Sequence, residues 1–207
     1  MRHIPKRETR EIDVLSFEDA LRDALLPSTE YDVGKWLYVP NFYSEYRYIL
    51  GTRGENPLIV IGANPSTAAP DALDPTLASA QRVAKNNGYD SFFMLNVYPQ
   101  RATDPNDMER ERNNFLEQQN VEAFKYLLTL SPTKNVWCAW GNLVTKRLYL
   151  ALCVNSLVLE GLHYDAHWLS AGEPLKSGQP HHPLYLKAAT QLIPYDPIIT
   201  ETPIPSY

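Results

Sequence analysis

Three short stretches of the sequence are apolar at nearly every position, and each one stops at a glycine or an asparagine. They cover residues 57–61, 91–95 and 135–140, and they end at Gly62, Asn96 and Gly141. Stretches of this kind are typical of strands that are buried on both faces of a sheet. The pattern therefore predicts three buried strands, and a fourth is expected near residues 166–169.

Helical segments separate these stretches, at about residues 76–87 and 109–130, and a further helix is expected to begin near Asn142. Regular alternation of strands and helices indicates a parallel sheet with helices on both faces. We expect an α/β fold, a three-layer α/β/α sandwich around a central, mostly parallel four-stranded sheet. Ligands of such sheets bind outside the carboxyl ends of the strands, so the polar residues there are candidates for a functional site.

The two ends of the chain follow a different pattern. Ser16 followed by Asp19 forms a capping box, which predicts a short helix that ends near Pro27. Residues 46–50 alternate aromatic and other side chains and are expected to form an edge strand. Residues 193–207 contain four prolines and are expected to wrap the surface. The predicted organisation is an N-terminal adaptor or extension at residues 1–45, an α/β domain at residues 46–194 and a proline-rich tail at residues 195–207.

The composition fits one soluble globular domain, since 207 residues are enough to bury a sizeable core. No stretch approaches the ~20 apolar residues of a membrane span, and the charged N-terminus predicts no secretory signal. Cys138 and Cys153 are the only cysteines, too few for a disulfide framework or a four-cysteine iron–sulfur cluster, so a cytoplasmic protein is expected. The net charge of −5 argues against a generally basic nucleic-acid-binding protein but is compatible with one local cationic patch.

Two strand ends carry asparagines that are suited to contact a ligand. In Gly62-Ala63-Asn64-Pro65-Ser66 the glycine permits a close turn, Asn64 presents an amide and Pro65 restricts the backbone. Asn96 can offer a donor and an acceptor to the edge of a ligand. Both asparagines also have a structural interpretation, in which they only bond loop backbone. In the same interpretation Arg101 and Asp104 form a local ion pair.

The two later motifs are Trp140-Gly141 and His181-His182-Pro183. The tryptophans at 137 and 140 are expected in the core, and Gly141 allows a tight exit from its strand. The adjacent histidines lack the spacing and the partner side chains of a zinc site, so no metal is expected. A histidine followed by Pro183 at the sheet edge suits a hydrogen-bonding catalyst.

Several enzyme classes are disfavoured by what the sequence lacks. Ser66 and Thr67 are not set in the G-x-S-x-G turn of a hydrolase nucleophile. The chain has neither a Walker loop nor a G-x-G-x-x-G motif, so no nucleotide cofactor is expected.

Taken in this order, the four motifs resemble those of the uracil-DNA glycosylase superfamily. Its members carry G-x-[DN]-P after the first strand, an Asn after a later one, a strand ending in W-G and a final H-P loop. The matching residues here are Gly62–Pro65, Asn96, Trp140-Gly141 and His182-Pro183. Over about residues 46–194 the chain also resembles an uncharacterised bacterial and phage domain family with N-P-S-T-A, D-P-T, R-A-T-D-P, W-G and H-P-L-Y motifs.

The resemblance implies a DNA glycosylase that flips a base out of double-stranded DNA and hydrolyses its N-glycosidic bond without a cofactor. It implies two catalytic residues: Asn64 would position water and stabilise the sugar cation, and His182 would bond the departing base. The implied base-binding residues are Gly62, Ala63, Ser66 and Asn96. The implied DNA-binding residues are Arg101, Tyr185, Leu186 and Lys187, with Lys146, Arg147 and Lys176 as further candidates. Leu186, with Tyr185 as its rival, would fill the vacated stack.

Three departures from the superfamily pattern bear on the substrate. Asn64 is neutral where the fastest members have a carboxylate, so catalysis is expected to depend more on His182. Ser66 stands where strict uracil enzymes have a tyrosine that blocks the pyrimidine 5-position, so 5-substituted pyrimidines are expected to fit. Leu184-Tyr185-Leu186 replaces Ser-Pro-Leu, which changes the expected phosphate contacts. The hypothesis is removal of modified pyrimidines, such as glucosylated hydroxymethylcytosine, from phage DNA.

Three alternatives stay open at this point. The chain is also compatible with a uracil or mismatch repair glycosylase, with a hydrolase of free nucleosides or nucleotides, and with a module that binds a modified base without cutting. The sequence indicates neither a membrane partner nor an obligate protein partner.

Overall fold

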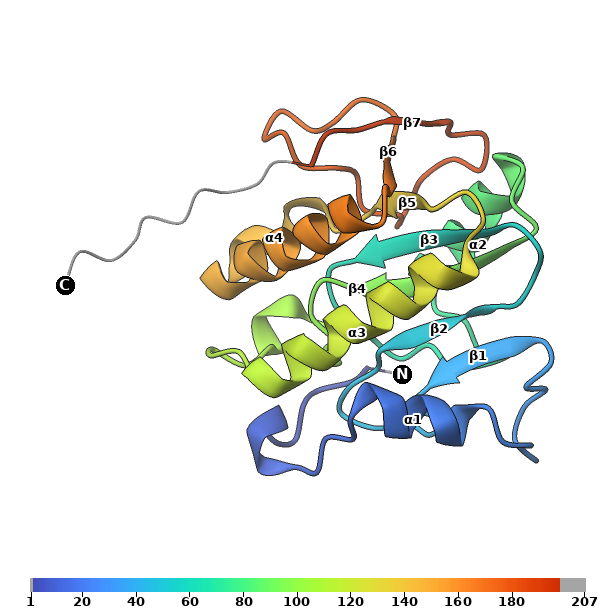
Figure 1. The fold of residues 1–207 in the computed structure, drawn as a ribbon. Helices are drawn as coiled ribbons and strands as arrows, with labels where there is room; N and C mark the ends of the chain where they lie inside the picture. Colours follow the sequence, from blue (N-terminus) through green and yellow to red (C-terminus); the bar gives the residue numbers. More distant parts are fainter. Residues whose placement is uncertain (1, 198–207) are drawn as a thin grey trace.

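The computed structural model of the chain describes residues 2–197 and contains one mixed sheet (Figure 1). Its strands are β1 (Trp36–Val39), β2 (Ile49–Thr52), β3 (Pro57–Gly62), β4 (Ser91–Asn96), β5 (Asn135–Cys138), β6 (His167–Ala171) and β7 (Leu192–Pro194). They lie in the order β1-β2-β4-β3-β5-β6-β7. The central order β4-β3-β5-β6 is the part of the sheet that positions the candidate site.

The pairs within this centre are parallel, and the pairs outside it are antiparallel. The α/β class is therefore confirmed, whereas the prediction of a four-stranded sheet is wrong because the sheet has seven strands. The four predicted strands make up the parallel centre. The outer strands were missed because they are short: β1 has four residues and β7 has three, too few to show a clear period.

Residues 2–197 also form four α-helices and three short 3-10 helices; the first of each kind precedes the first strand, and the others lie between strands. They are α1 (Phe17–Ala24), α2 (Pro75–Asn86), α3 (Asn114–Leu130), α4 (Leu148–His163), η1 (Thr9–Glu11), η2 (Pro105–Asp107) and η3 (Gly141–Lys146). Ser16 caps α1 as predicted, by accepting a hydrogen bond from the Asp19 N–H. The helix expected at 109–130 starts later because Asn113 caps it, accepting from the N–H groups of Phe115 and Leu116. The helix expected near Asn142 is divided into η3 and α4.

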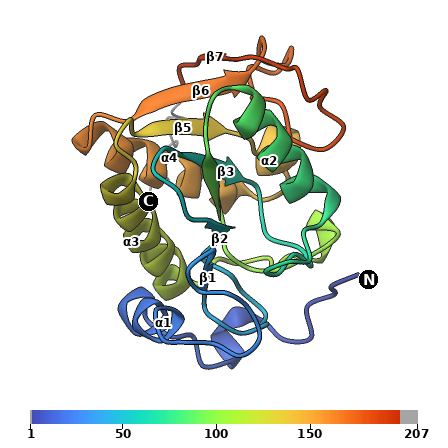
Figure 2. The same ribbon diagram turned by 90° about the vertical axis from the view of Figure 1, so that its right-hand side faces the viewer.

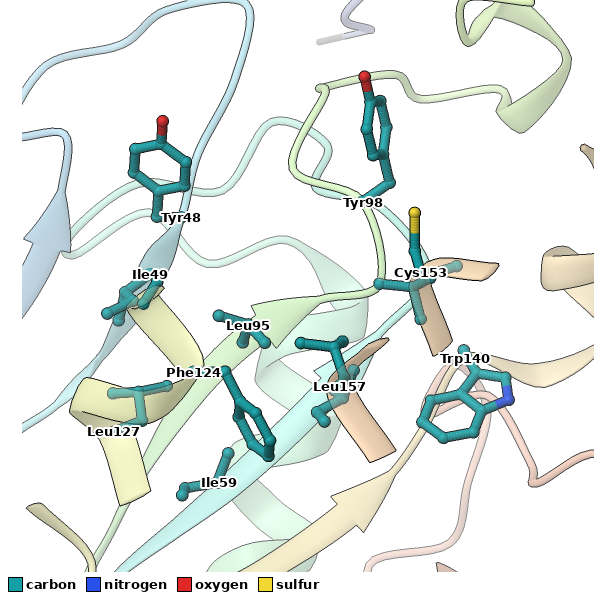
Figure 3. Close-up of a cluster of buried hydrophobic side chains, with 14 of the residues drawn as sticks. Tyr48, Ile49, Ile59, Leu95, Tyr98, Phe124, Leu127, Trp140, Cys153 and Leu157 are labelled. Carbon is teal, nitrogen blue, oxygen red and sulfur yellow. The ribbon is translucent and has the colours of Figure 1, made fainter. Parts of the chain in front are cut away.

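Helices cover both faces of the sheet. The apolar side of α2 packs in one cluster with one face, and α1, α3 and α4 pack in a second cluster with the other (Figure 2). Figure 3 shows part of the larger cluster, where Ile59 and Leu95 of the sheet meet Phe124 of α3. Trp137 and Trp140 are 0% and 2% exposed, so their interpretation as core residues is confirmed.

Residues 2–45 are part of the same structure. β1 pairs with β2, and Phe17, Ala20 and Ala24 of α1 are buried in the larger core cluster. The sheet therefore extends across the boundary expected at residue 45. The edge strand expected at 46–50 is also misplaced, since β2 begins at Ile49 and lies between β1 and β4.

The chain beyond β6 returns to the sheet. β7 pairs antiparallel with β6, and the N–H of Tyr195 then donates to the carbonyl oxygen of Trp168 at 3.0 Å. Residues 198–207 of the predicted tail lie outside the described residues. Within residues 2–197, no helix combines the length and the apolar character needed to cross a membrane.

Candidate functional site

The carboxyl ends of β3 and β4 lie side by side. The two strands pair in parallel with Gly62 opposite Asn96. The pairing continues into the loops, where the N–H of Val97 donates to Gly62 O at 2.7 Å and the N–H of Tyr98 to Ala63 O at 3.1 Å. The first two sequence motifs are therefore brought together by the register of one strand pair.

The side-chain amide nitrogen of Asn96 is buried and unpaired. The side chain is 3% exposed, and its Nδ2 has no hydrogen-bond partner in the structure. A methyl group at Gly62 would lie 2.8 Å from Asn96 Oδ1, so any larger residue at position 62 would force the Asn96 side chain to shift. Buried amide groups are almost always hydrogen-bonded, which makes the unpaired nitrogen a candidate contact for a ligand.

Asn120 of α3 positions Asn96 and was not predicted from the sequence. Its Nδ2 donates to the backbone oxygen of Asn96 at 2.8 Å, and its own Oδ1 is buried without a partner. The side chain is 1% exposed. The one sequence signal that could have found Asn120 is the presence of a polar asparagine on the buried side of a long helix.

Asn64 combines a structural bond with a free oxygen. Its Nδ2 donates to Ala102 O at 2.7 Å and to Pro65 O at 3.1 Å, which ties the loops after β3 and β4 together. These hydrogen bonds to loop backbone are the ones expected if Asn64 has a structural role. Among residues 2–197 no hydrogen bond to Asn64 Oδ1 is formed, and the residue is half-buried. The oxygen can therefore accept a hydrogen bond from water or from a ligand.

His182 lies against the end of β5. Gly141 has a φ of +60°, and a methyl group there would lie 3.1 Å from the Cβ of His182. The loop of His182 is also held by Trp140, whose Nε1 donates to Gln179 Oε1 at 2.9 Å. The W-G and H-P motifs are thus in direct contact.

The imidazole of His182 has a defined tautomer. Its Nδ1 faces the N–H of Leu184 at 3.2 Å and must accept that hydrogen bond, so the proton of the neutral ring is on Nε2. Burial lowers the pKa of His182 from its ordinary value of 6.5, and the negative charge of Asp74 opposes part of this shift. At neutral pH the side chain therefore offers an N–H donor without carrying a charge.

This state of His182 leads to a testable prediction. Its imidazole is expected to titrate with a midpoint below 6.5, followed through the ring protons by NMR and assigned with a His182→Gln variant. Because the unfolded chain binds this proton more readily, the stability that the group contributes is complete above about pH 6.5 and falls at lower pH. A midpoint at or above 6.5 would contradict the burial that the structure gives to the ring.

Ser66 is small, half-buried and linked to the N-terminal segment. Its Oγ shares a hydrogen bond of 2.9 Å with Thr103 Oγ1, which also accepts from the N–H of His3 at 2.7 Å. Ala63 is buried beside it. The N-terminal segment therefore contributes to the wall of the site, which the expected boundary at residue 45 did not predict.

A family comparison matches the region that builds this site. Residues 47–184, more than half of the chain, match the family described as "Protein of unknown function (DUF1643)". The chain belongs to the DUF1643 family. Comparisons with curated proteins and with solved structures gave no match. The DUF1643 region begins just before β2 and ends two residues after His182, so it contains Asn64, Asn96 and His182.

Within the DUF1643 region, Arg101 is buried and does not lie at the surface, where a DNA contact was expected. The side chain is 0% exposed, and its Nη1 donates to Ser66 O and Ala68 O. It forms no ion pair with Asp104, which was the alternative; Asp104 pairs with Arg2 instead. Arg147 is also engaged by backbone, since its Nη2 donates to Asn106 O and Met108 O at 2.9 Å each.

The loop after His182 presents Tyr185 to solvent. This tyrosine is 91% exposed and has a φ of +69°, whereas Leu186 is half-buried against the smaller core cluster. Of the two rivals for a wedge, the structure therefore favours Tyr185. The remaining cationic candidates are all exposed: Lys146, Lys176 and Lys187.

Two surface pockets lie away from this site. One of about 390 Å³ is lined by the N-terminal segment and residues 107–110, and one of about 580 Å³ lies beside α2 near Tyr89. Neither is lined by Asn64, Asn96 or His182. Because Asn96 is 3% exposed, a ligand that pairs with its amide has to displace part of the surrounding loops.

Proposed function

We propose that this protein is a DNA glycosylase with a uracil-DNA-glycosylase-like fold. It flips out a 5-substituted pyrimidine, including glucosylated hydroxymethylcytosine of phage DNA, and leaves an abasic site. The observation that carries the proposal is the buried, unpaired amide nitrogen of Asn96, at the end of a strand beside Gly62. A base edge that enters beside it supplies the missing partner.

The chemistry follows from the neighbouring groups. A water molecule held by Asn64 Oδ1 adds to C1′ of the sugar as the C1′–N bond breaks, and the bonding electron pair leaves with the base. The transition state resembles an oxocarbenium ion, as in other glycoside hydrolysis. Nε2–H of His182 hydrogen-bonds the negative charge that develops on the base. The water proton passes to solvent, because a neutral amide does not take it up.

The small Ser66 supports a 5-substituted substrate, since its hydroxyl is engaged with Thr103 and leaves that side of the base without a bulky side chain. Tyr185 is the exposed group suited to fill the space left by a flipped base. Lys146, Lys176 and Lys187 supply exposed charge for the DNA backbone.

The proposal is tested by incubating the purified protein with duplex DNA that contains glucosylated hydroxymethylcytosine, uracil or unmodified cytosine. Alkali-labile abasic sites are expected in the modified duplex and in none of the unmodified DNA. Cleavage of uracil DNA alone would favour the repair enzyme. Absence of abasic sites in all three would overturn glycosylase activity, and tight binding to modified DNA would then indicate a binding module.

One observation favours a second candidate, a hydrolase of free nucleosides or nucleotides. Arg101 is buried and Arg147 is engaged by backbone carbonyl groups, so two of the predicted DNA contacts are not exposed cations available to the phosphodiester backbone of a duplex. Release of the base from free nucleosides or nucleotides, measured by chromatography, would support this candidate. A salt-dependent affinity for duplex DNA would support the glycosylase.

A further inference from the structure

Two arginine side chains, Arg47 and Arg101, are buried next to each other beside the loop that follows β3. Both are 0% exposed. Nη1 of each donates to the same acceptor, the carbonyl oxygen of Ala68, at 3.2 Å. The shared acceptor brings two guanidinium cations together in a place without solvent.

Most of the remaining donors of this pair are unpaired. Nε and Nη2 of Arg47 and Nε of Arg101 are buried without a hydrogen-bond partner, whereas Nη2 of Arg101 donates to the Tyr38 hydroxyl at 3.2 Å. Nε and Nη2 form the side-on edge of a guanidinium, which grips two oxygens of a carboxylate or a phosphate. In Arg47 neither nitrogen of this edge, Nε or Nη2, has a protein acceptor.

The charge of the pair is also unbalanced. Within residues 2–197 neither arginine forms an ion pair. Asp74 is the carboxylate whose charge acts on both, and it caps α2 by accepting from Leu77 N–H. Burial, and then the charge of Arg101, lower the pKa of Arg47 to about 9, which leaves it protonated at pH 7. A buried water can pair a donor, but it does not neutralise this excess charge.

We propose that Arg47 and Arg101 form a phosphate-binding site. A tetrahedral phosphate has enough oxygens to meet the side-on edge of Arg47 and Nε of Arg101 together, whereas a carboxylate has only two. A phosphate monoester or inorganic phosphate also brings a second negative charge, which matches the two cations. Phosphate binding by these buried, unpaired donors does not require glycosidic cleavage.

Tyr43 covers this site from the solvent side. Its ring lies over the Arg101 guanidinium with 4.3 Å from the carbon Cζ to the ring centroid, and the tyrosine is 50% exposed. Its hydroxyl is held by Nδ1 of His3 at 3.0 Å. Movement of this one ring uncovers the Arg101 guanidinium beneath it. An exposed ring beside a phosphate is also suited to stack on a base. The ligand is therefore the phosphate monoester of a nucleotide or of a nucleic-acid strand end.

The proposal is tested by titrating the full-length protein with inorganic phosphate at constant ionic strength, by calorimetry and by thermal unfolding. Saturable binding and a rise in Tm are expected with phosphate and not with chloride. Arg47→Met is expected to bind phosphate about tenfold more weakly or worse. Arg82→Met, which removes an exposed arginine and the same charge, is expected to bind like the wild type. Absence of saturable phosphate binding by the wild type overturns the proposal whether or not the Arg47 variant folds.

Two further probes distinguish the sources of the phosphoryl group. Tighter binding of thymidine 5′-monophosphate than of inorganic phosphate, lost in Arg47→Met, supports a free nucleotide. Binding of a duplex with a 5′-terminal phosphate, weakened by Arg47→Met and not by Arg82→Met and lost when that phosphate is removed, supports the phosphate of a strand end. Equal binding of all three probes by the wild type and Arg47→Met overturns the site. Abasic-site formation is measured separately from phosphate binding. A protein that binds phosphate without forming abasic sites would contradict only the glycosylase proposal, and the reverse result would contradict only the phosphate site.

Discussion

Replacing His182 by alanine is expected to slow base release about 100- to 1,000-fold, because one preorganised donor to the developing negative charge is removed. Its Nε2–H is available since Nδ1 accepts from Leu184 N–H. Asn64 does not take over this role, because its Nδ2 is engaged by Ala102 and Pro65. The measurement is the single-turnover rate of abasic-site formation on the modified duplex described above.

The adjacent histidine provides a matched control for this variant. His181→Ala removes the same side chain one residue away and is expected to keep the rate within about threefold of the wild type. His182→Gln retains an N–H donor and is expected to recover part of the rate. Affinity for DNA is expected to stay within a few-fold in all three variants. A His182→Ala rate equal to that of His181→Ala would remove His182 from the mechanism.

Replacing Phe124 by alanine is expected to give the largest loss of stability, about 3–5 kcal/mol. The ring is 0% exposed and lies in the core between sheet and helices (Figure 3). Its centroid is 6.1 Å from that of Trp168. Removing it leaves a cavity that the packed strands cannot close. Since domains are stable by only about 5–15 kcal/mol, this is a large part of the total. A fall in Tm of roughly 10 °C is expected in thermal unfolding followed by circular dichroism.

The same helix offers the control. Phe115, in the first turn of α3, is 46% exposed, and Phe115→Ala is expected to cost less than about 1 kcal/mol. Equal losses of stability in the two variants would contradict the burial of Phe124 in the core.

The meeting of Gly62 and Asn96 was predictable because it depends on local information. Each lies at the end of a wholly buried strand, and parallel strands that are neighbours bring their carboxyl ends to one edge. The surroundings of Asn96 were not predictable in the same way. Asn120 reaches it from α3, 24 positions along the chain, and this contact depends on how the helix packs.

Arg101 shows why the burial of a predicted DNA contact could not be read from the sequence. An arginine in a polar loop is usually exposed, and nothing adjacent to it in the sequence indicates burial. Its surroundings come from distant segments: Tyr38 of β1, Tyr43 before β2, and Ser66 after β3. The N-terminal segment, expected to be an adaptor, supplies part of this cover.

The sequence by itself determined the α/β class, the four parallel central strands and the polar residues at their ends, because buried strands have a composition that is visible locally. Tertiary structure alone decided the seven-stranded sheet, the burial of His182, the unpaired amide nitrogen of Asn96 and the buried pair of Arg47 and Arg101. These features depend on which segments, far apart in the sequence, pack together and bury a side chain. Burial and charge balance arise only when the whole chain has packed.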